Sequence, residues 1–124
     1  MAEPKRTVLL VDDSKDILRM FSQVLRKKGY FVVAAKSGSE ALEWLGRIIF
    51  DAAVIDLHLP DANGTDLLLK IQETTPKTAR IVLTGSPEAM NIRDVAAKLA
   101  DAFLLKPVEP EAFLRIIEEK IGNR

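Results

Sequence analysis

The sequence of this chain has no cysteine, and its absence excludes disulfide bonds, thiol chemistry and thiolate metal sites. An excess of charge of either sign is missing too, because 18 lysine and arginine residues balance 18 acidic ones. No basic cluster is longer than residues 26–28. A protein that binds the phosphates of nucleic acid usually concentrates positive charge on one face. We therefore expect no direct contact with nucleic acid.

Long hydrophobic runs are absent as well. No apolar run approaches the roughly 20 residues of a membrane-spanning helix, and the apolar stretch after residues 1–6 is too short for a signal peptide. We expect a cytoplasmic protein without a membrane partner. The 124 residues and the 48% hydrophobic content fit one globular domain with one sizeable core. We expect that domain to span residues 1–124, with no output domain after it.

What the sequence does contain is a regular alternation of short apolar runs and longer helical patterns. Strand-forming runs are found at residues 7–11, 30–35, 51–55, 81–83 and 102–105. Helices are predicted to begin after Ser14, after residues 37–39, after the turn residues 59–64, at Ser86–Pro87 and at Pro110.

The spacing of apolar residues also predicts which side of each helix is buried. In the second helix the residues expected to face inward are Ala41, Leu42, Leu45, Ile48 and Ile49. In the fourth helix they are Val95, Ala96 and Leu99.

Five strands that alternate with five helices predict an α/β fold. We expect a single doubly wound domain in which right-handed crossovers join parallel strands and helices cover both faces of the sheet. The continuous apolar runs agree with burial of the strands on both faces. Ligands in such folds bind outside the carboxyl ends of the strands, near the point where the strand order reverses. A functional site is therefore expected at that edge.

Five polar side chains follow apolar runs and are predicted to lie at this edge. Asp12 and Asp13 follow the first run, and Asp56 follows the third. Thr84 and Lys106 follow the fourth and fifth runs. A carboxylate at the end of a buried strand costs free energy unless it has a partner. The sequence therefore predicts that these groups form one site.

Such a set of groups suits a divalent cation and a phosphate. Clustered carboxylates disfavour each other's ionised form unless a cation shares them. Oxygen ligands without histidine or cysteine partners favour Mg²⁺, with Mn²⁺ as the alternative, over zinc. An aspartate is ionised at neutral pH, so it can attack phosphorus without a general base. Lys106 and the Thr84 hydroxyl can each contact a phosphoryl oxygen.

Four motifs, taken in order, resemble the receiver domains of bacterial two-component response regulators. They are Val8-Leu-Leu-Val-Asp-Asp-Ser14, Asp56-Leu-His-Leu-Pro60 with Gly64, Leu83-Thr-Gly-Ser86 and Phe103-Leu-Leu-Lys-Pro107. Each motif alone is weak, but together they cover essentially the whole chain. The resemblance implies a chemotaxis-regulator-like, flavodoxin-like (βα)5 fold with a five-stranded sheet in the order 2-1-3-4-5.

The resemblance also implies a role for each residue of the site. Asp56 would accept a phosphoryl group from a phosphohistidine on a histidine kinase or a histidine phosphotransfer protein. Asp13 would bind Mg²⁺ directly and Asp12 directly or through water. Asp56 and the His58 backbone carbonyl would complete the protein ligands. A domain of this kind catalyses only its own phosphorylation and dephosphorylation, so we expect no further enzyme activity.

A switch is the last feature that the resemblance implies. Thr84 would be drawn toward the phosphoryl group, and Phe103 would move into the space that it leaves. The surface of the fourth helix, fifth strand and last helix would then change and signal to a downstream protein target or an output domain. Homodimers through this surface are a habit of the family. The Lys106–Pro107 bond is cis in the family.

Each of these residues has a simpler interpretation when it is considered alone. Asp12 and Asp13 before Ser14 are typical of a helix N-cap. Asp56 can organise its loop, and Phe103 can be a core residue.

Two other functions are therefore kept as hypotheses. The first is a Mg²⁺-dependent phosphatase with an aspartyl nucleophile, although His58 stands where its general acid is normally found. The second is a receiver-like interaction module that is not phosphorylated, although the presence of all five site residues argues against it.

Overall fold

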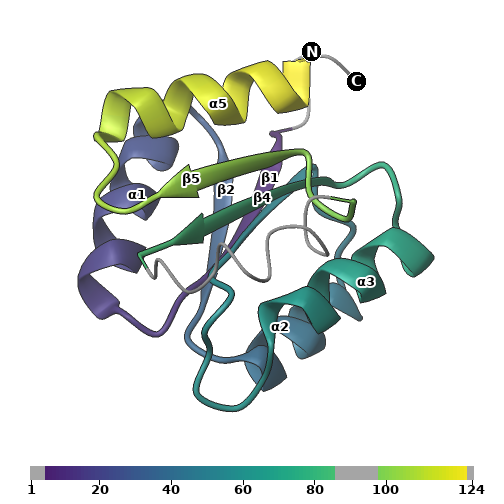
Figure 1. Ribbon diagram of the computed structural model, residues 1–124. Coiled ribbons are helices and arrows are strands. Elements are labelled where there is room, and N and C mark those ends of the chain that lie inside the picture. The colour runs from purple at the N-terminus through teal and green to yellow at the C-terminus, as the bar shows by residue number, and fades with distance from the viewer. Residues whose placement is uncertain (1–4, 86–97, 123–124) are drawn as a thin grey trace.

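The protein is a five-stranded parallel sheet with helices on both faces (Figure 1). The computed structural model describes residues 5–85 and 98–122. The elements in chain order are β1 (Thr7–Val11), α1 (Lys15–Lys27), β2 (Phe31–Ala35), α2 (Gly38–Leu45), β3 (Ala52–Ile55), α3 (Gly64–Thr74), β4 (Ala79–Thr84), β5 (Ala102–Leu105) and α5 (Pro110–Gly122). The helix predicted to begin at Ser86–Pro87, with Val95 and Ala96, lies outside the described residues.

The strands are parallel and follow the order β2-β1-β3-β4-β5. This order confirms the predicted doubly wound fold. The chain passes from β1 outward to β2 and then returns to place β3 on the other side of β1. The strand order therefore reverses between β1 and β3, and ligands of such folds bind at the carboxyl end of this pair.

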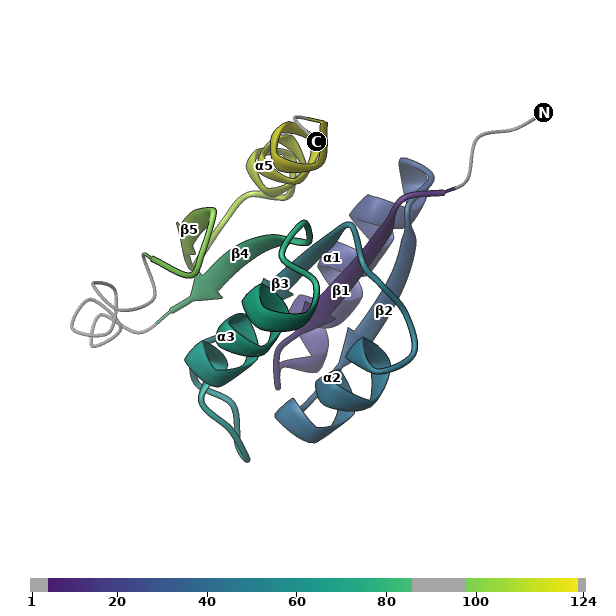
Figure 2. The same ribbon diagram turned by 90° about the vertical axis from the view of Figure 1, so that its right-hand side faces the viewer.

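Two apolar clusters form the core, one on each face of the sheet. Figure 2 shows the helices that lie on the two sides of the sheet. The helices α1 and α5 cover one face, where the rings of Phe21 and Phe113 lie 4.1 Å apart between centroids. The helices α2 and α3 cover the other face, where Ala41, Leu67 and Leu68 are buried against the sheet. Both faces of the central strands are therefore covered, as their apolar runs predict.

Side-chain caps explain where the first three helices begin. The Ser14 hydroxyl accepts from Ile17 N at 3.3 Å, and the Ser37 hydroxyl accepts from Glu40 N at 3.2 Å. Asn63 caps α3 in the same way, through Thr65 N at 3.1 Å. These contacts confirm the predicted start after Ser14, and α2 begins at Gly38, within the predicted segment 37–39.

The inward face predicted for α2 is partly wrong. Ala41 is buried, but Leu42 is 47% exposed and Ile49 is 77% exposed. The helix ends at Leu45, and Gly46 is its C-cap, so Ile49 does not continue the helical spacing. The apolar spacing continues past the end of α2, so periodicity alone wrongly assigned Ile49 to this helix.

Among the residues that the structure describes, no helix has both the length and the apolar character needed to cross a membrane.

Candidate functional site

The register of the sheet brings the ends of β1 and β3 side by side. Val11 pairs with Ile55, and Asp56 N donates to Val11 O at 2.9 Å. On the other side of β1, Asp12 N donates to Ala35 O at 3.1 Å. Asp12 and Asp56 therefore emerge from neighbouring strands at the same edge, because each is the first residue after its strand.

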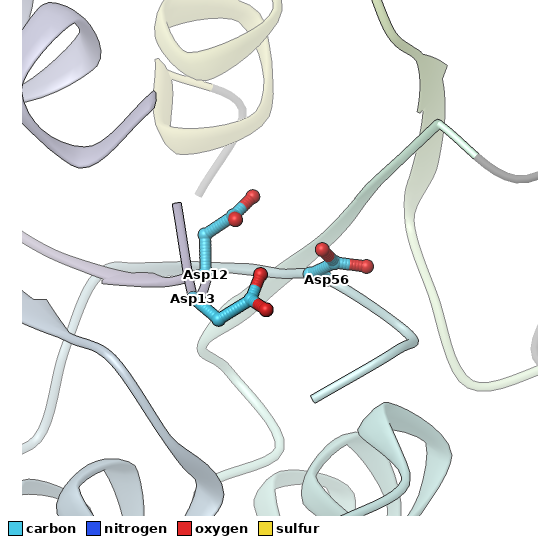
Figure 3. Close-up of side chains that lie close together, drawn as sticks. All are labelled: Asp12, Asp13 and Asp56. Carbon is cyan, nitrogen blue, oxygen red and sulfur yellow. The ribbon is translucent and has the colours of Figure 1, made fainter. Parts of the chain in front are cut away.

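Three carboxylates meet at this edge (Figure 3). Asp12, Asp13 and Asp56 each offer a carboxylate oxygen, and these oxygens lie within 4.8 Å of one another. Asp12 and Asp56 are buried, with 3% and 6% exposure, whereas Asp13 is exposed. The structure thus brings together the three acidic residues singled out by the sequence, and it leaves one side of their cluster open to solvent.

Lys106 is the cation that faces this cluster. Its backbone N donates to Thr84 O at 2.8 Å, which continues the pairing of β5 with β4. Its Nζ lies 2.7 Å from Asp12 Oδ2 and 3.3 Å from Asp56 Oδ2. The Lys106–Pro107 peptide bond is cis, as the resemblance implied. One ammonium group therefore contacts two buried carboxylates.

Backbone groups hold the second oxygen of each buried carboxylate. Asp12 Oδ1 accepts from Ser14 N at 2.9 Å, and Asp56 Oδ1 accepts from His58 N at 3.0 Å. Asp12 Oδ2 is buried and has no hydrogen bond to the described residues beyond its ion pair with Lys106. Both side chains are thus fixed with one oxygen turned toward Lys106.

The electrostatics of the site favour an added positive charge. Burial raises the pKa of Asp12 above its usual value, although the hydrogen bonds from Lys106 and Ser14 N oppose this rise. Burial acts against the charge of Lys106, but the hydrogen bonds and the attraction of Asp12 and Asp56 prevail and raise its pKa. Lys106 is therefore a stable cation, and Asp12 still lacks full compensation for its charge.

Thr84 and Phe103 lie close to the site in the sheet. Thr84 ends β4, is buried and pairs with Leu105, the residue before Lys106. Phe103 pairs with Val82 and packs, partly buried, against the core cluster on the α2 and α3 face. A Cβ atom on Gly85 would lie 3.4 Å from the Lys106 side chain, so Gly85 lies directly beside this side chain.

One residue near the site was missed by the sequence reasoning. The segment 59–64 was interpreted only as turn chemistry, yet the Asp61 carboxylate accepts from Gly38 N at 2.8 Å and from Ser39 N at 3.0 Å. These partners are more than 20 residues away in the chain. Local sequence has no signal for such a contact.

The donor set fits a hard divalent cation. Two oxygens bound to one Mg²⁺ lie at most about 4.2 Å apart, so carboxylates whose oxygens lie within 4.8 Å need only a small side-chain adjustment. Asp12 Oδ2 is a buried acceptor without a hydrogen bond to the described residues beyond its contact with Lys106, and Asp13 is open to solvent. Residues Asp12, Asp13 and Asp56 can therefore share such an ion.

Comparisons with known proteins agree with this geometry. The model of the response regulator receiver domain family matches residues 8–118. The transcriptional regulatory protein GlrR of Escherichia coli (strain K12) is 31% identical over 121 residues, which cover 98% of this chain and 27% of the relative. The chain therefore spans little more than a quarter of the length of that relative.

Two solved structures resemble the whole chain. A response regulator receiver domain protein (CheY-like) from Methanospirillum hungatei JF-1 is 35% identical, with a TM-score of 0.88 and coverage of 97% of this chain and 96% of that one. A response regulator protein from Burkholderia pseudomallei, solved with a phosphorylated aspartic acid, a calcium ion and citrate, is 28% identical, with a TM-score of 0.84. The match covers 96% of this chain and 70% of that one.

Proposed function

The chain belongs to the response regulator receiver domain family, and on this premise we propose that Asp56 is the phosphoacceptor of a two-component signalling switch. One observation supports this most strongly. The Asp56 carboxylate is buried at the end of β3, with Oδ1 held by His58 N and Oδ2 3.3 Å from Lys106 Nζ. A carboxylate so placed is oriented and lies next to a cation that can contact a phosphoryl oxygen.

The Asp56 carboxylate acts as the nucleophile. A bond forms between a carboxylate oxygen and the phosphorus of a partner phosphohistidine, while the bond from phosphorus to nitrogen breaks. The electron pair stays on the imidazole nitrogen, which takes a proton from solvent. The donor must carry a labile phosphoryl group, and the partner that supplies it is a histidine kinase or a histidine phosphotransfer protein.

Asp12, Asp13 and Asp56, with the His58 backbone carbonyl, hold Mg²⁺, with Mn²⁺ as the alternative. When bound, the ion screens the charge of the phosphoryl oxygens. The response regulator protein from Burkholderia pseudomallei was solved with both a phosphorylated aspartic acid and a calcium ion, and this supports a divalent ion in such a domain. Lys106 stabilises the same phosphoryl charge from the side of β5.

Thr84 and Phe103 pass the change to the surface. The Thr84 hydroxyl moves to donate to the phosphoryl group, and Phe103 repacks into the space next to β4. The surface of β5 and α5 then binds a downstream protein target, an output domain or a second copy of the chain. Because the relative GlrR is a transcriptional regulatory protein, gene regulation is one such output. We place this signalling in the cytoplasm.

The decisive experiment is phosphorylation with a small donor. The protein is incubated with Mg²⁺ and acetyl phosphate, and its intact mass is measured. We expect one added phosphoryl group in the wild type and in an Asp66→Asn control, and none in Asp56→Asn. An unmodified wild type contradicts the proposal. Continuous hydrolysis of phosphate esters would instead identify the phosphatase considered above.

A further inference from the structure

The loop between β3 and α3 is bound to the first turn of α2 by one carboxylate. Asp61 Oδ1 accepts from Gly38 N at 2.8 Å, and Asp61 Oδ2 accepts from Ser39 N at 3.0 Å. Ser37 accepts from the next two N–H groups of the helix, through its hydroxyl and its carbonyl oxygen. Asp61 therefore completes a helix cap that local residues provide only in part.

Close packing reinforces this contact. A Cβ atom on Gly38 would lie 2.5 Å from the Cβ of Ala62 and 3.3 Å from Asp61 Oδ1. Such a distance is shorter than carbon atoms in contact tolerate, so only glycine lets the loop lie this close to the helix. The loop and the helix are thus joined by two hydrogen bonds and by direct packing of Ala62 on Gly38.

The same loop carries the backbone of the proposed metal site. His58 N donates to Asp56 Oδ1, and His58 pairs with Asn63 in an isolated antiparallel bridge. Gly64 N donates to Leu57 O at 3.0 Å and closes the loop at its base. Asp61 lies at the tip, between the two bridged residues. Because the loop is closed in this way, a shift of its tip also shifts the backbone of His58.

The helix end to which Asp61 binds is itself connected to Asp12. The helix α2 starts shortly after β2, and Ala35, the last residue of β2, accepts from Asp12 N at 3.1 Å. A short path of backbone contacts thus joins the loop of His58 to the strand end of Asp12. The Asp61 contact sets the relative position of two groups that are expected to bind the same ion.

We propose that Asp61 is a positioning residue for the divalent cation: by anchoring the loop to α2, it holds the His58 carbonyl in place relative to Asp12 and Asp56. This inference rests on the proposed function. Groups that orient metal ligands without touching the ion typically change metal affinity by about 10- to 100-fold when they are removed. The hydrogen bonds from Gly38 N and Ser39 N lower the pKa of Asp61, so its carboxylate stays an acceptor at neutral pH.

The test is a direct titration with Mg²⁺ by calorimetry. We expect Asp61→Ala to bind Mg²⁺ about tenfold more weakly than the wild type. Asp61→Asn keeps one acceptor oxygen and should lie between the two. Asp66→Ala removes the same charge from an exposed position on α3 and serves as the control, with unchanged affinity. Urea unfolding of each variant shows that the titrated protein is folded.

Three outcomes would overturn the inference. If Asp61→Ala lowers the urea midpoint but binds Mg²⁺ like the wild type, Asp61 only stabilises α2 and the inference is wrong. If the wild type takes up a phosphoryl group while Asp61→Ala keeps wild-type Mg²⁺ affinity, the inference fails and the proposed function stands. If the wild type neither binds Mg²⁺ nor becomes phosphorylated, both are overturned.

Discussion

The ammonium of Lys106 lies closer to Asp12 than to Asp56, with Nζ 2.7 Å from Asp12 Oδ2 and 3.3 Å from Asp56 Oδ2. The lysine thus mainly compensates a carboxylate of the proposed metal site. A divalent cation held by Asp12 would supply this compensation in its place. We therefore expect metal binding to leave Lys106 available for a phosphoryl group on Asp56.

Removal of the Lys106 charge tests whether a metal ion replaces the lysine as the partner of Asp12. In a chelator, Lys106→Met should lower the free energy of unfolding by about 2 kcal/mol, because two buried carboxylates lose their cation and Lys106 is only partly exposed. With Mg²⁺ present, the difference from the wild type should shrink. Urea unfolding in both buffers measures it, with Lys70→Met on the exposed face of α3 as the control. The same difference in both buffers would argue against charge exchange.

The raised pKa of Asp12 predicts how stability depends on pH. The folded protein protonates Asp12 at a higher pH than the unfolded chain, where the carboxyl has its ordinary pKa of 3.8. The stability of the metal-free protein therefore falls as pH rises from 3.8 through the raised pKa of Asp12. The Asp12→Asn variant has no carboxyl to ionise at this position, so its stability should not fall in this way. It should therefore be more stable than the wild type at neutral pH in a chelator.

Urea unfolding over a series of pH values checks this prediction. Asp16→Asn, an exposed position in the first turn of α1, is the matched control and should bring no gain. A less stable Asp12→Asn at neutral pH would show that the Lys106 ion pair outweighs the cost of burial.

The site could be predicted from the sequence because its residues stand at or just after the ends of apolar strands, and Asp12, Asp56 and Lys106 are each the first residue after one. The strands 7–11 and 102–105 were predicted with their observed bounds, and parallel register then brings Asp12, Asp56 and Lys106 to one edge. The distance from Lys106 to each carboxylate could not be predicted, because it depends on side-chain packing rather than on order along the chain.

Thr84→Ala separates acceptance of the phosphoryl group from the response to it. Asp56 should still be phosphorylated, because its carboxylate and Lys106 are unchanged. The response of Phe103 should be lost, because no hydroxyl remains to be drawn toward the phosphoryl group. The NMR signals of Phe103, recorded with and without acetyl phosphate, measure this response. Thr84→Ser retains the hydroxyl and should respond normally, and a normal response in Thr84→Ala would refute the coupling.

Gly64 is required by a close approach of α3 to the end of β3. A Cβ atom at this position would lie 2.5 Å from Asp56 O and 2.7 Å from Leu57 Cα, and both are backbone atoms that cannot yield easily. We expect Gly64→Ala to lower the free energy of unfolding by about 1–3 kcal/mol. Gly122→Ala is the control in the same urea experiment, because an added Cβ there would meet no other part of the described chain within 4 Å beyond its chain neighbours and its own helix backbone. Equal stability of the two variants would contradict the packing argument.

Features that depend on contacts between distant segments were beyond the sequence. Asp61 sits in a turn whose composition already explained it, so its hydrogen bonds to Gly38 and Ser39 had no local signal. Ile49 was expected to be buried because it continued an apolar spacing, but α2 ends before it. In both cases the structure of a neighbouring segment, rather than the local pattern, determines the outcome.

The position of the phosphoryl group tests the central claim most directly. An aspartyl phosphate is an acyl phosphate, and borohydride reduces it to an alcohol that marks the acceptor as homoserine. After incubation with Mg²⁺ and acetyl phosphate, reduction and proteolysis, mass spectrometry should find homoserine at position 56 and unmodified aspartate at Asp12 and Asp13. Homoserine at position 12 or 13 would contradict the assignment of Asp56 as the phosphoacceptor. The absence of homoserine from all three positions would contradict it as well.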